Sequence, residues 1–547
     1  YEEFKPDYII GSLVTSETKR PDEDDILLQL ENMITSKQHP FKIPDSIGIT
    51  IFNYTKVALL DFSKFDELYE LGYKNTTELI PEIKKNVKRE ISNTDINSKR
   101  KEFQKKKPDL IIDNIIIDGV SKAEQKYINN SIKQNKKLLD LEQFKESYYY
   151  LVSDNQIQSA QPRAIYNPEN GFFDVNLKVK KTDKYELLLG GNVSSGFSNM
   201  AFIGVNYRIL DKSAWLFHGN MYFGRLYSAI KVSTRIDLPL HIPIALKLSA
   251  SFNRWDYYKS NSKTFFDDRR PPYLIHHDYH TRAEAITPLN NKTILKLGTN
   301  IGMVIDNYFQ VNNFIQSDTA DNTYMNSLRF FSAIETNTLN FKQYPNDGTY
   351  RNVGVSYNFG REINYPGSTS AAFDTATNTH NWLNLNFVND SYFNLSKKFS
   401  LGVYGELSFS SIPLLNNYTS SVIAAKGFYP TPHSKTLFLE DYRANAYVAA
   451  GLKTIYKFTD RLNFRLEGFL FAPYQKILKQ DLGNQVFKAY YSEPLKHFYP
   501  MAAATMVYNT PLGPASVSVH YYEKEGSKIY YLFHIGYLIF NKKTDEY

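Results

Sequence analysis

The chain has 547 residues, with 64 Lys and Arg against 57 Asp and Glu and a formal net charge of +7; this length indicates two or three domains. It contains no Cys, which excludes a disulfide framework and thiolate metal sites. The charge is modest and Lys is spread thinly over residues 1–183, which favours solvated surface lysines over a nucleic-acid-binding stripe.

Hydropathy alone would class the chain as soluble, because no run reaches about 18 apolar residues and the mean hydropathy is −0.43. In the strands of a transmembrane barrel, however, apolar and polar residues alternate, so their hydropathy values cancel in any sliding window. The 42 Tyr and 37 Phe suit the aromatic girdles of such a barrel.

The first segment, residues 1–100, is predicted to be the end of an α/β domain followed by a linker. We expect Ser63 to cap its last helix and Gly72 to end it. The polar stretch 86–107 is interpreted as a linker or an exposed helix. The predicted elements are strands at 8–12 and 57–62 and helices at 24–34 and 64–71.

The second segment, residues 108–182, has the order β-α-α-β-β. Its first helix begins with a capping box, in which Ser121 is the N-cap and Glu124 follows three residues later. Asn167–Gly171 is the turn of the final hairpin. The segment resembles a POTRA domain, the periplasmic module that precedes barrels of the BamA and two-partner-secretion type.

The third segment, residues 183–541, is predicted to be an antiparallel transmembrane β-barrel of sixteen strands, so the fold class is mainly β. Strict alternation marks strands with two unlike faces: Val517 and Val519 alternate with Ser516 and Ser518 in the last hairpin. The sixteen stretches with this alternation, one for each predicted strand, begin near residues 185, 202, 215, 227, 244, 279, 293, 324, 352, 382, 401, 444, 462, 498, 515 and 529.

The closing strand of this barrel is expected to run through Gly536 and to end on Phe540, because apolar residues continue on every second position as far as Ile539. Residues 542–547 are then a short tail. The chain opens at Tyr1 without a signal peptide, although a surface barrel must be secreted. We therefore expect a longer precursor with its signal upstream.

Two stretches resemble the BamA-type barrel family. Residues 510–514, Thr-Pro-Leu-Gly-Pro, resemble the start of the penultimate strand, and residues 425–429, Ala-Lys-Gly-Phe-Tyr, resemble the family's lumenal motif. That motif has Arg where this chain has Lys426, followed by Gly427 and Phe428. The resemblance implies that the cation pairs with an inward carboxylate, for which the candidate is Glu467; the alternative is a hydrated lumenal Lys with no fixed partner.

The first segment also resembles the end of a bacterial patatin-like phospholipase domain, through residues 4–12 and 60–73. This resemblance implies a Ser–Asp dyad that hydrolyses acyl esters. The chain contains neither Gly-x-Ser-x-Gly nor Asp-Gly-Gly, and Asp118-Gly119-Val120 reads as a turn. No catalytic residue is therefore assigned in this chain, and the dyad is expected upstream of Tyr1.

The cluster His276-His277-Asp278-Tyr279-His280 is the only metal-like group of the sequence. Alternation separates His277 from His276 and His280, and the cluster follows Pro271-Pro272 at an expected junction of loop and strand. We interpret these residues as loop histidines near the membrane surface, and we assign no metal and no cofactor.

The leading functional hypothesis is an outer-membrane-anchored lipid acyl hydrolase of the phospholipase A type, with the POTRA domain and barrel as its anchor or export route. The alternative is a protein translocase or insertase, or a structural subunit of an outer-membrane assembly, without enzymatic activity. A third alternative, a soluble β-rich binding protein, would need polar residues on both strand faces, whereas the outer faces here are apolar. The expected partners are membrane lipids and possible proteins of an outer-membrane complex, with no nucleic acid, and the first two segments are expected in the periplasm.

Overall fold

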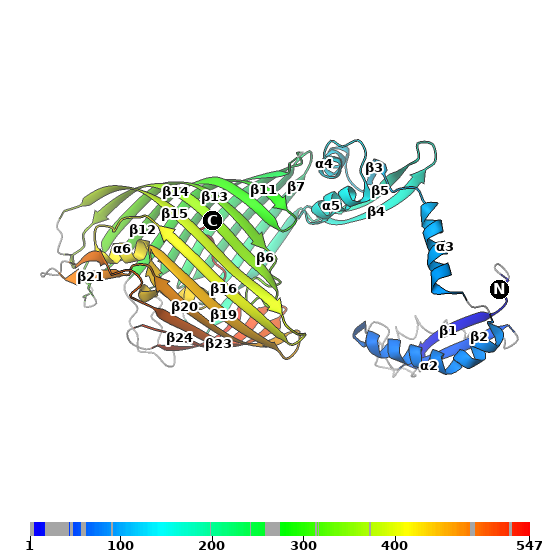
Figure 1. Cartoon of the computed structure of the whole chain (residues 1–547). Helices are drawn as coiled ribbons and strands as arrows, with labels where there is room; N and C mark the ends of the chain where they lie inside the picture. Colours follow the sequence, from blue (N-terminus) through cyan, green and yellow to red (C-terminus); the bar gives the residue numbers. More distant parts are fainter. Residues whose placement is uncertain are drawn as a thin grey trace, which may run out of the picture. The chain divides into compact units, whose positions relative to one another are not determined.

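The computed structural model describes residues 5–16, 43, 47–55, 62–88, 91–196, 198–240, 242–257, 274–311, 314–315, 317–370, 374–481, 487–524 and 528–547. The chain divides into two compact units, Tyr1–Pro108 and Asp109–Tyr547 (Figure 1).

The first unit contains a parallel pair of strands, β1 (Ile9–Ser16) and β2 (Gly48–Thr55). Among the residues of this unit that the structure describes, Ile43 and Ile51 are the buried apolar side chains. Strand β2 was not predicted. Two helices follow the strands, α2 (Phe65–Asn86) and α3 (Asn93–Lys105), and neither buries a residue.

Several predictions for this unit need correction. Helix α2 does not end at Gly72: it continues through Gly72 and Pro81 to Asn86. Ser63 is not its cap, because the helix is preceded by a 3-10 turn, η1 (Phe62–Lys64), and its N-cap Lys64 makes no side-chain capping bond. The predicted helix 24–34 and residues 57–61 of the predicted strand lie outside the described residues. The stretch 86–107 contains an exposed helix, as one of its two interpretations had it.

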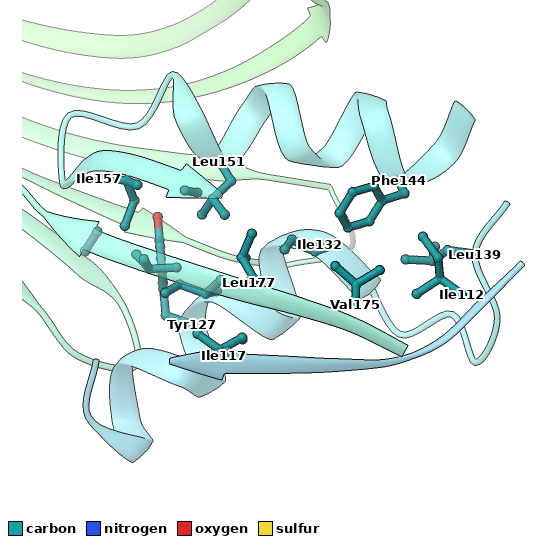
Figure 2. Close-up of a cluster of buried hydrophobic side chains, with 14 residues drawn as sticks. Ile112, Ile117, Tyr127, Ile132, Leu139, Phe144, Leu151, Ile157, Val175 and Leu177 are labelled. Atoms are coloured by element: carbon teal, nitrogen blue, oxygen red, sulfur yellow. The ribbon is translucent and has the colours of Figure 1, made fainter. Parts of the chain in front are cut away.

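The second unit begins with β3 (Ile112–Asp118), α4 (Lys122–Lys133), α5 (Leu141–Val152), β4 (Ile157–Asn167) and β5 (Phe172–Lys181). This is the predicted β-α-α-β-β order. The strands form one sheet in the order β3-β5-β4, with β3 and β5 parallel. Both helices pack on it through the apolar side chains drawn in Figure 2, among them Ile132, Phe144 and Leu177.

The capping box at the start of α4 is confirmed. Ser121 N–H donates to Glu124 Oε2 at 2.7 Å, and the Ser121 hydroxyl accepts from Glu124 N–H. The Lys181 ammonium on β5 lies 2.7 Å from Glu124 Oε1. Burial alone would raise the pKa of Glu124, but the hydrogen bonds from Lys181 and Ser121 outweigh it and lower that pKa. This one carboxylate therefore ties the first turn of α4 to the last residue of the sheet.

Sixteen of the remaining strands close into a barrel, as predicted (Figure 1). Neighbours pair antiparallel all around it. The strands are β6 (Tyr185–Ser194), β7 (Met200–Leu210), β8 (Ala214–Gly224), β9 (Tyr227–Leu238), β10 (Ile244–Asp256), β11 (Leu274–Asn290), β12 (Thr293–Tyr308), β13 (Asp321–Asn337), β14 (Gly348–Tyr365), β15 (Ala376–Asn394), β16 (Phe399–Ser410), β19 (Ala446–Lys457), β20 (Leu462–Pro473), β23 (Tyr499–Thr510), β24 (Gly513–Tyr522) and β25 (Ile529–Gly536).

The two faces of these strands differ in polarity. On β24, Ser516 and Ser518 are at most 2% exposed, whereas Val517 between them is 58% exposed. The same contrast holds on β10, where Leu248 is 56% exposed beside a buried Ser249. Apolar side chains therefore cover the outside and polar side chains the inside, which is the arrangement of a transmembrane barrel with a polar lumen.

The connections at the end where β6 begins are short, with one exception at 338–347, and the other end carries the long connections 257–273, 309–320, 411–445 and 474–498. The longest, 411–445, carries α6 (Tyr418–Ala424) and two short strands that pair with each other, β17 (Lys426–Gly427) and β18 (Arg443–Ala444). Among the described residues, no helix has the length and apolarity needed to span a membrane.

Candidate functional site

The motif Lys426-Gly427-Phe428 lies inside the barrel. The Phe428 ring is completely buried and packs against the rings of inward residues from β16, β19 and β20, namely Tyr404, Tyr447, Phe469 and Phe471. A Cβ atom at Gly427 would lie 2.4 Å from the Tyr429 ring. A side chain at position 427 would therefore have to displace the ring of Tyr429, which covers the backbone here.

The partner predicted for Lys426 is wrong. The Lys426 ammonium lies 3.0 Å from Glu406 Oε1 on β16, and it also donates to Asn386. Glu467 instead accepts from Arg465 on its own strand, at 3.0 Å. The lumenal lysine therefore has a fixed carboxylate, but the carboxylate comes from the strand that precedes the lumenal segment.

The Glu406 carboxylate also accepts hydrogen bonds from two tyrosines. The hydroxyls of Tyr404 and Tyr447 donate to its two carboxylate oxygens, each at 2.7 Å. A second buried cation, Lys453, contacts Asp390 at 2.8 Å. Buried charges on the inner wall of β15, β16, β19 and β20 are thus paired and hydrogen-bonded, as burial requires.

The seam between β25 and β6, where the barrel closes, is its shortest strand pairing. Only His534, Ile535 and Gly536 pair with β6, whereas β12 and β13 pair over sixteen residues. One backbone hydrogen bond beyond each end extends the seam, Ser195 N–H to Phe533 O and Tyr537 N–H to Gly191 O, both at 2.9 Å. The barrel is closed here by a few residues only.

Gly536 ends the seam. Its φ of +103° is accessible to glycine, and a Cβ atom at this position would lie 2.2 Å from Gly191 O. Residues 185–190 of β6 have an unpaired edge on the side that faces β25. The described residues include no strand that pairs with this edge. Leu187 and Leu189 there are 64% and 71% exposed.

The prediction that the closing strand ends on Phe540 is wrong. Strand β25 ends at Gly536, and the chain then enters the lumen. Phe540 packs edge-on against Tyr227 of β9, with ring centroids 4.9 Å apart, and Leu538 N–H donates to Gln343 Oε1 at 2.8 Å. Gln343 belongs to the connection 338–347, which also enters the lumen: the Arg465 guanidinium donates to Pro345 O.

The histidine cluster lies within β11 and not in a loop, which corrects that prediction. His276 contacts Asp306 at 2.6 Å and His280 contacts Asp278 at 2.8 Å, while His277 contacts the Tyr279 hydroxyl. Among the described residues, no three side chains of metal-ligand type come together. These histidines are hydrogen-bonded members of a strand.

Comparisons with known proteins give no match to any family profile and none to any curated protein. Solved structures do match. A BamA from Haemophilus ducreyi lacking POTRA domains 1–3 is 12% identical, with 78% of this chain and 84% of that chain covered and a TM-score of 0.52. CdiB from Acinetobacter baumannii is 10% identical (88% and 88%, TM-score 0.45), and CdiB from Escherichia coli is 10% identical (79% and 77%, TM-score 0.43).

The likeness to BamA extends to the fold, a closed sixteen-stranded antiparallel barrel. Together with the apolar outer face, this fold makes the chain an outer-membrane β-barrel.

Proposed function

We propose that this chain is a polypeptide translocase or insertase of the outer membrane, which receives unfolded polypeptide at the seam between β25 and β6. The observation that carries the proposal is the three-residue pairing at that seam. It favours the non-enzymatic alternative of the sequence analysis over the lipid hydrolase.

The physical argument concerns the free edge of β6. An unpaired strand edge presents backbone N–H and C=O groups that another extended chain can pair with. Such an edge is a liability in a membrane, because unsatisfied backbone groups are costly there. The unpaired edge of β6 is therefore suited to pair with a β-strand of a client polypeptide. That strand would form hydrogen bonds with the unpaired backbone groups of β6. The segment 109–182, which resembles a POTRA domain, would lead clients to it.

The test is a reversible lock of the seam. Val193 and Ile535 are paired neighbours on β6 and β25, both exposed on the outer face, and the chain has no other thiol. The Val193→Cys/Ile535→Cys variant, closed by a short thiol cross-linker that a reductant cleaves, should lose at least tenfold in the rate of client-barrel assembly in proteoliposomes. Reduction should restore the rate.

The matched control joins two strands elsewhere. Val448 and Ala472 pair across β19 and β20, so the Val448→Cys/Ala472→Cys variant should leave the rate unchanged. Equal rates for the locked and unlocked seams would refute the proposed function.

A second candidate is the outer-membrane-anchored acyl hydrolase. The parallel pair β1–β2 followed by α2 has the α/β character of the domain that residues 4–12 and 60–73 resemble. This function requires a Gly-x-Ser-x-Gly serine that these 547 residues do not contain. Its test is ester hydrolysis by a chain carrying such an elbow, compared with its Ser→Ala variant; equal rates would exclude the hydrolase.

A further inference from the structure

The segment Tyr537–Tyr547 follows the inner wall of the barrel away from the seam. Asn541 exchanges hydrogen bonds with Asn220 of β8, and its N–H donates to the Tyr227 hydroxyl. Thr544 meets Asp278 of β11, and the Tyr547 hydroxyl contacts Ser356 of β14 at 3.2 Å. The same hydroxyl donates to Asn384 O of β15 at 3.4 Å, and with the carbonyl contacts below, eight consecutive strands, β8 to β15, contact this segment of eleven residues.

The wall holds this segment mainly by its main-chain carbonyls. The donors are side chains on neighbouring strands, and they contact four of the last six carbonyl oxygens. Asn253 donates to Lys542 O at 3.3 Å, Arg282 to Lys543 O and Glu546 O at 2.9 and 2.8 Å, and Asn300 and Arg329 to Thr544 O at 2.9 and 2.8 Å. Carbonyl oxygens are common to every residue type, so this recognition accepts many sequences.

Side chains of the segment add a few contacts. Thr544 N–H and hydroxyl both donate to Asp278, each at 2.8 Å, and the Tyr547 ring lies 4.3 Å from the Arg329 guanidinium. Asp545 and Glu546 remain exposed. The segment is therefore held on one side and open to the lumen on the other.

Arg329 indicates that the segment can be exchanged. Its side chain is 1% exposed, two of its guanidinium nitrogens, Nε and Nη2, have no hydrogen-bond partner, and no carboxylate of the described residues forms an ion pair with it. A buried cation with no carboxylate in direct contact is costly. Release of the segment would return this cation to water. The gain in hydration would offset part of the free energy lost with the contacts of the segment.

We propose that the lumenal wall formed by Asn253, Arg282, Asn300 and Arg329 is a binding site for extended polypeptide main chain, and that Tyr537–Tyr547 is its resident occupant. The inference rests on the proposed function in one respect: a client polypeptide that enters from the seam would replace the resident segment. The site binds peptide in either case, and its test needs no client barrel.

The first experiment locks the resident segment in place. An ideal Cβ at Gly302 lies 3.4 Å from Thr544 Cβ, close to the separation of about 3.5–4.5 Å found in disulfides, and the chain has no Cys to compete. The probe is a fluorescent synthetic peptide with the sequence of residues 537–547, added to the Gly302→Cys/Thr544→Cys variant in lipid nanodiscs. The oxidised form should bind the peptide at least tenfold more weakly than the same protein after reduction. The peptide affinity of each single Cys variant should be the same with and without oxidant.

The second experiment empties the site and tests its chemistry. Removal of residues 541–547 should tighten peptide binding at least tenfold, and in that background Arg282→Met and Arg329→Met should each weaken it about tenfold. The matched control is Arg361→Met, since Arg361 is exposed on the outer face of β14. A peptide with Ala at Lys542, Lys543 and Glu546 should bind within about threefold of the original.

Equal binding by the oxidised and reduced protein, or no gain on truncation, would overturn the site. A tenfold loss with the alanine peptide would overturn main-chain recognition. Peptide binding that behaves as expected while the seam lock leaves client assembly unchanged would refute the proposed function and leave this site standing.

Discussion

The Lys426 ammonium and the Glu406 carboxylate, 3.0 Å apart, join the lumenal segment 411–445 to the inner wall of β16. The hydroxyls of Tyr404 and Tyr447 complete the hydrogen bonds of the same carboxylate. Glu406 is therefore the anchor of the segment, and Lys426 is one of three groups that it holds.

Glu406→Gln should destabilise the barrel by about 2 kcal/mol, because hydrogen bonds to a charged group are lost and a largely buried ammonium loses its anion. The Lys426 side chain is 31% exposed, so water moderates the loss. The measurement is urea unfolding of the protein in detergent, followed by Trp fluorescence.

A double-mutant cycle separates the observed pair from the one predicted from the sequence. Lys426→Met should couple to Glu406→Gln by about 1 kcal/mol, and it should show no coupling to Glu467→Gln, since Glu467 is held by Arg465. Stronger coupling to Glu467 than to Glu406 would contradict the assignment.

The sixteen strands could be predicted because alternation is a local property of the chain. A strand with one face in lipid and one in the lumen must change polarity at every residue, as Val517 and Ser518 do. The partner of Lys426 is not local. It depends on which of several inward carboxylates the long segment 411–445 approaches, and the sequence gives no register for such a segment.

The end of β25 was missed for a related reason. Tyr537 and Ile539 continue the alternation beyond the strand, but the backbone leaves the barrel wall at Gly536, whose φ is +103°. The glycine was the available signal, since it marks a place where the backbone can turn or approach another chain closely. The contacts that draw Phe540 inward, with Tyr227, lie more than 300 residues away in sequence.

Gly536→Ala should disrupt the seam. The new methyl group would meet Gly191 O at 2.2 Å, and the residue would be strained at its positive φ by about 1–2 kcal/mol. The fraction of compact, heat-modifiable protein on refolding into lipid vesicles should fall. Gly468→Ala is the matched control, because Gly468 also lies on a barrel strand and a Cβ there meets nothing within 4 Å; an equal loss in both variants would show that Gly536 has no special role.

Glu124→Gln should loosen the start of α4 by about 1 kcal/mol at pH 7, since it weakens the capping box and removes the charge that faces Lys181. The folded-state pKa of Glu124 lies below its ordinary value of 4.5, so the carboxylate contributes its stability above about that pH and loses it as the pH falls through the folded-state pKa. Amide hydrogen exchange of residues 122–128, corrected for intrinsic rates, should be faster in the variant at pH 7, and the difference should shrink towards pH 3. A difference that persists unchanged at pH 3 would mean that the charge of Glu124 is irrelevant.

Leu248→Arg tests whether the outer face of the barrel lies in hydrocarbon. Leu248 sits near the middle of β10 and is 56% exposed, so an arginine there should cost about 2–4 kcal/mol when the protein is folded in a bilayer. Leu512 provides the matched control: it is 85% exposed in the two-residue turn between β23 and β24, at the end of the barrel, where the same substitution should cost about 0–1 kcal/mol. Urea titration of both variants in lipid vesicles measures the two costs. In detergent-free buffer or in a soluble fold the two positions would be equivalent exposed leucines, so equal costs in the bilayer would contradict a membrane-spanning barrel and, with it, both proposals made for the seam and the lumen.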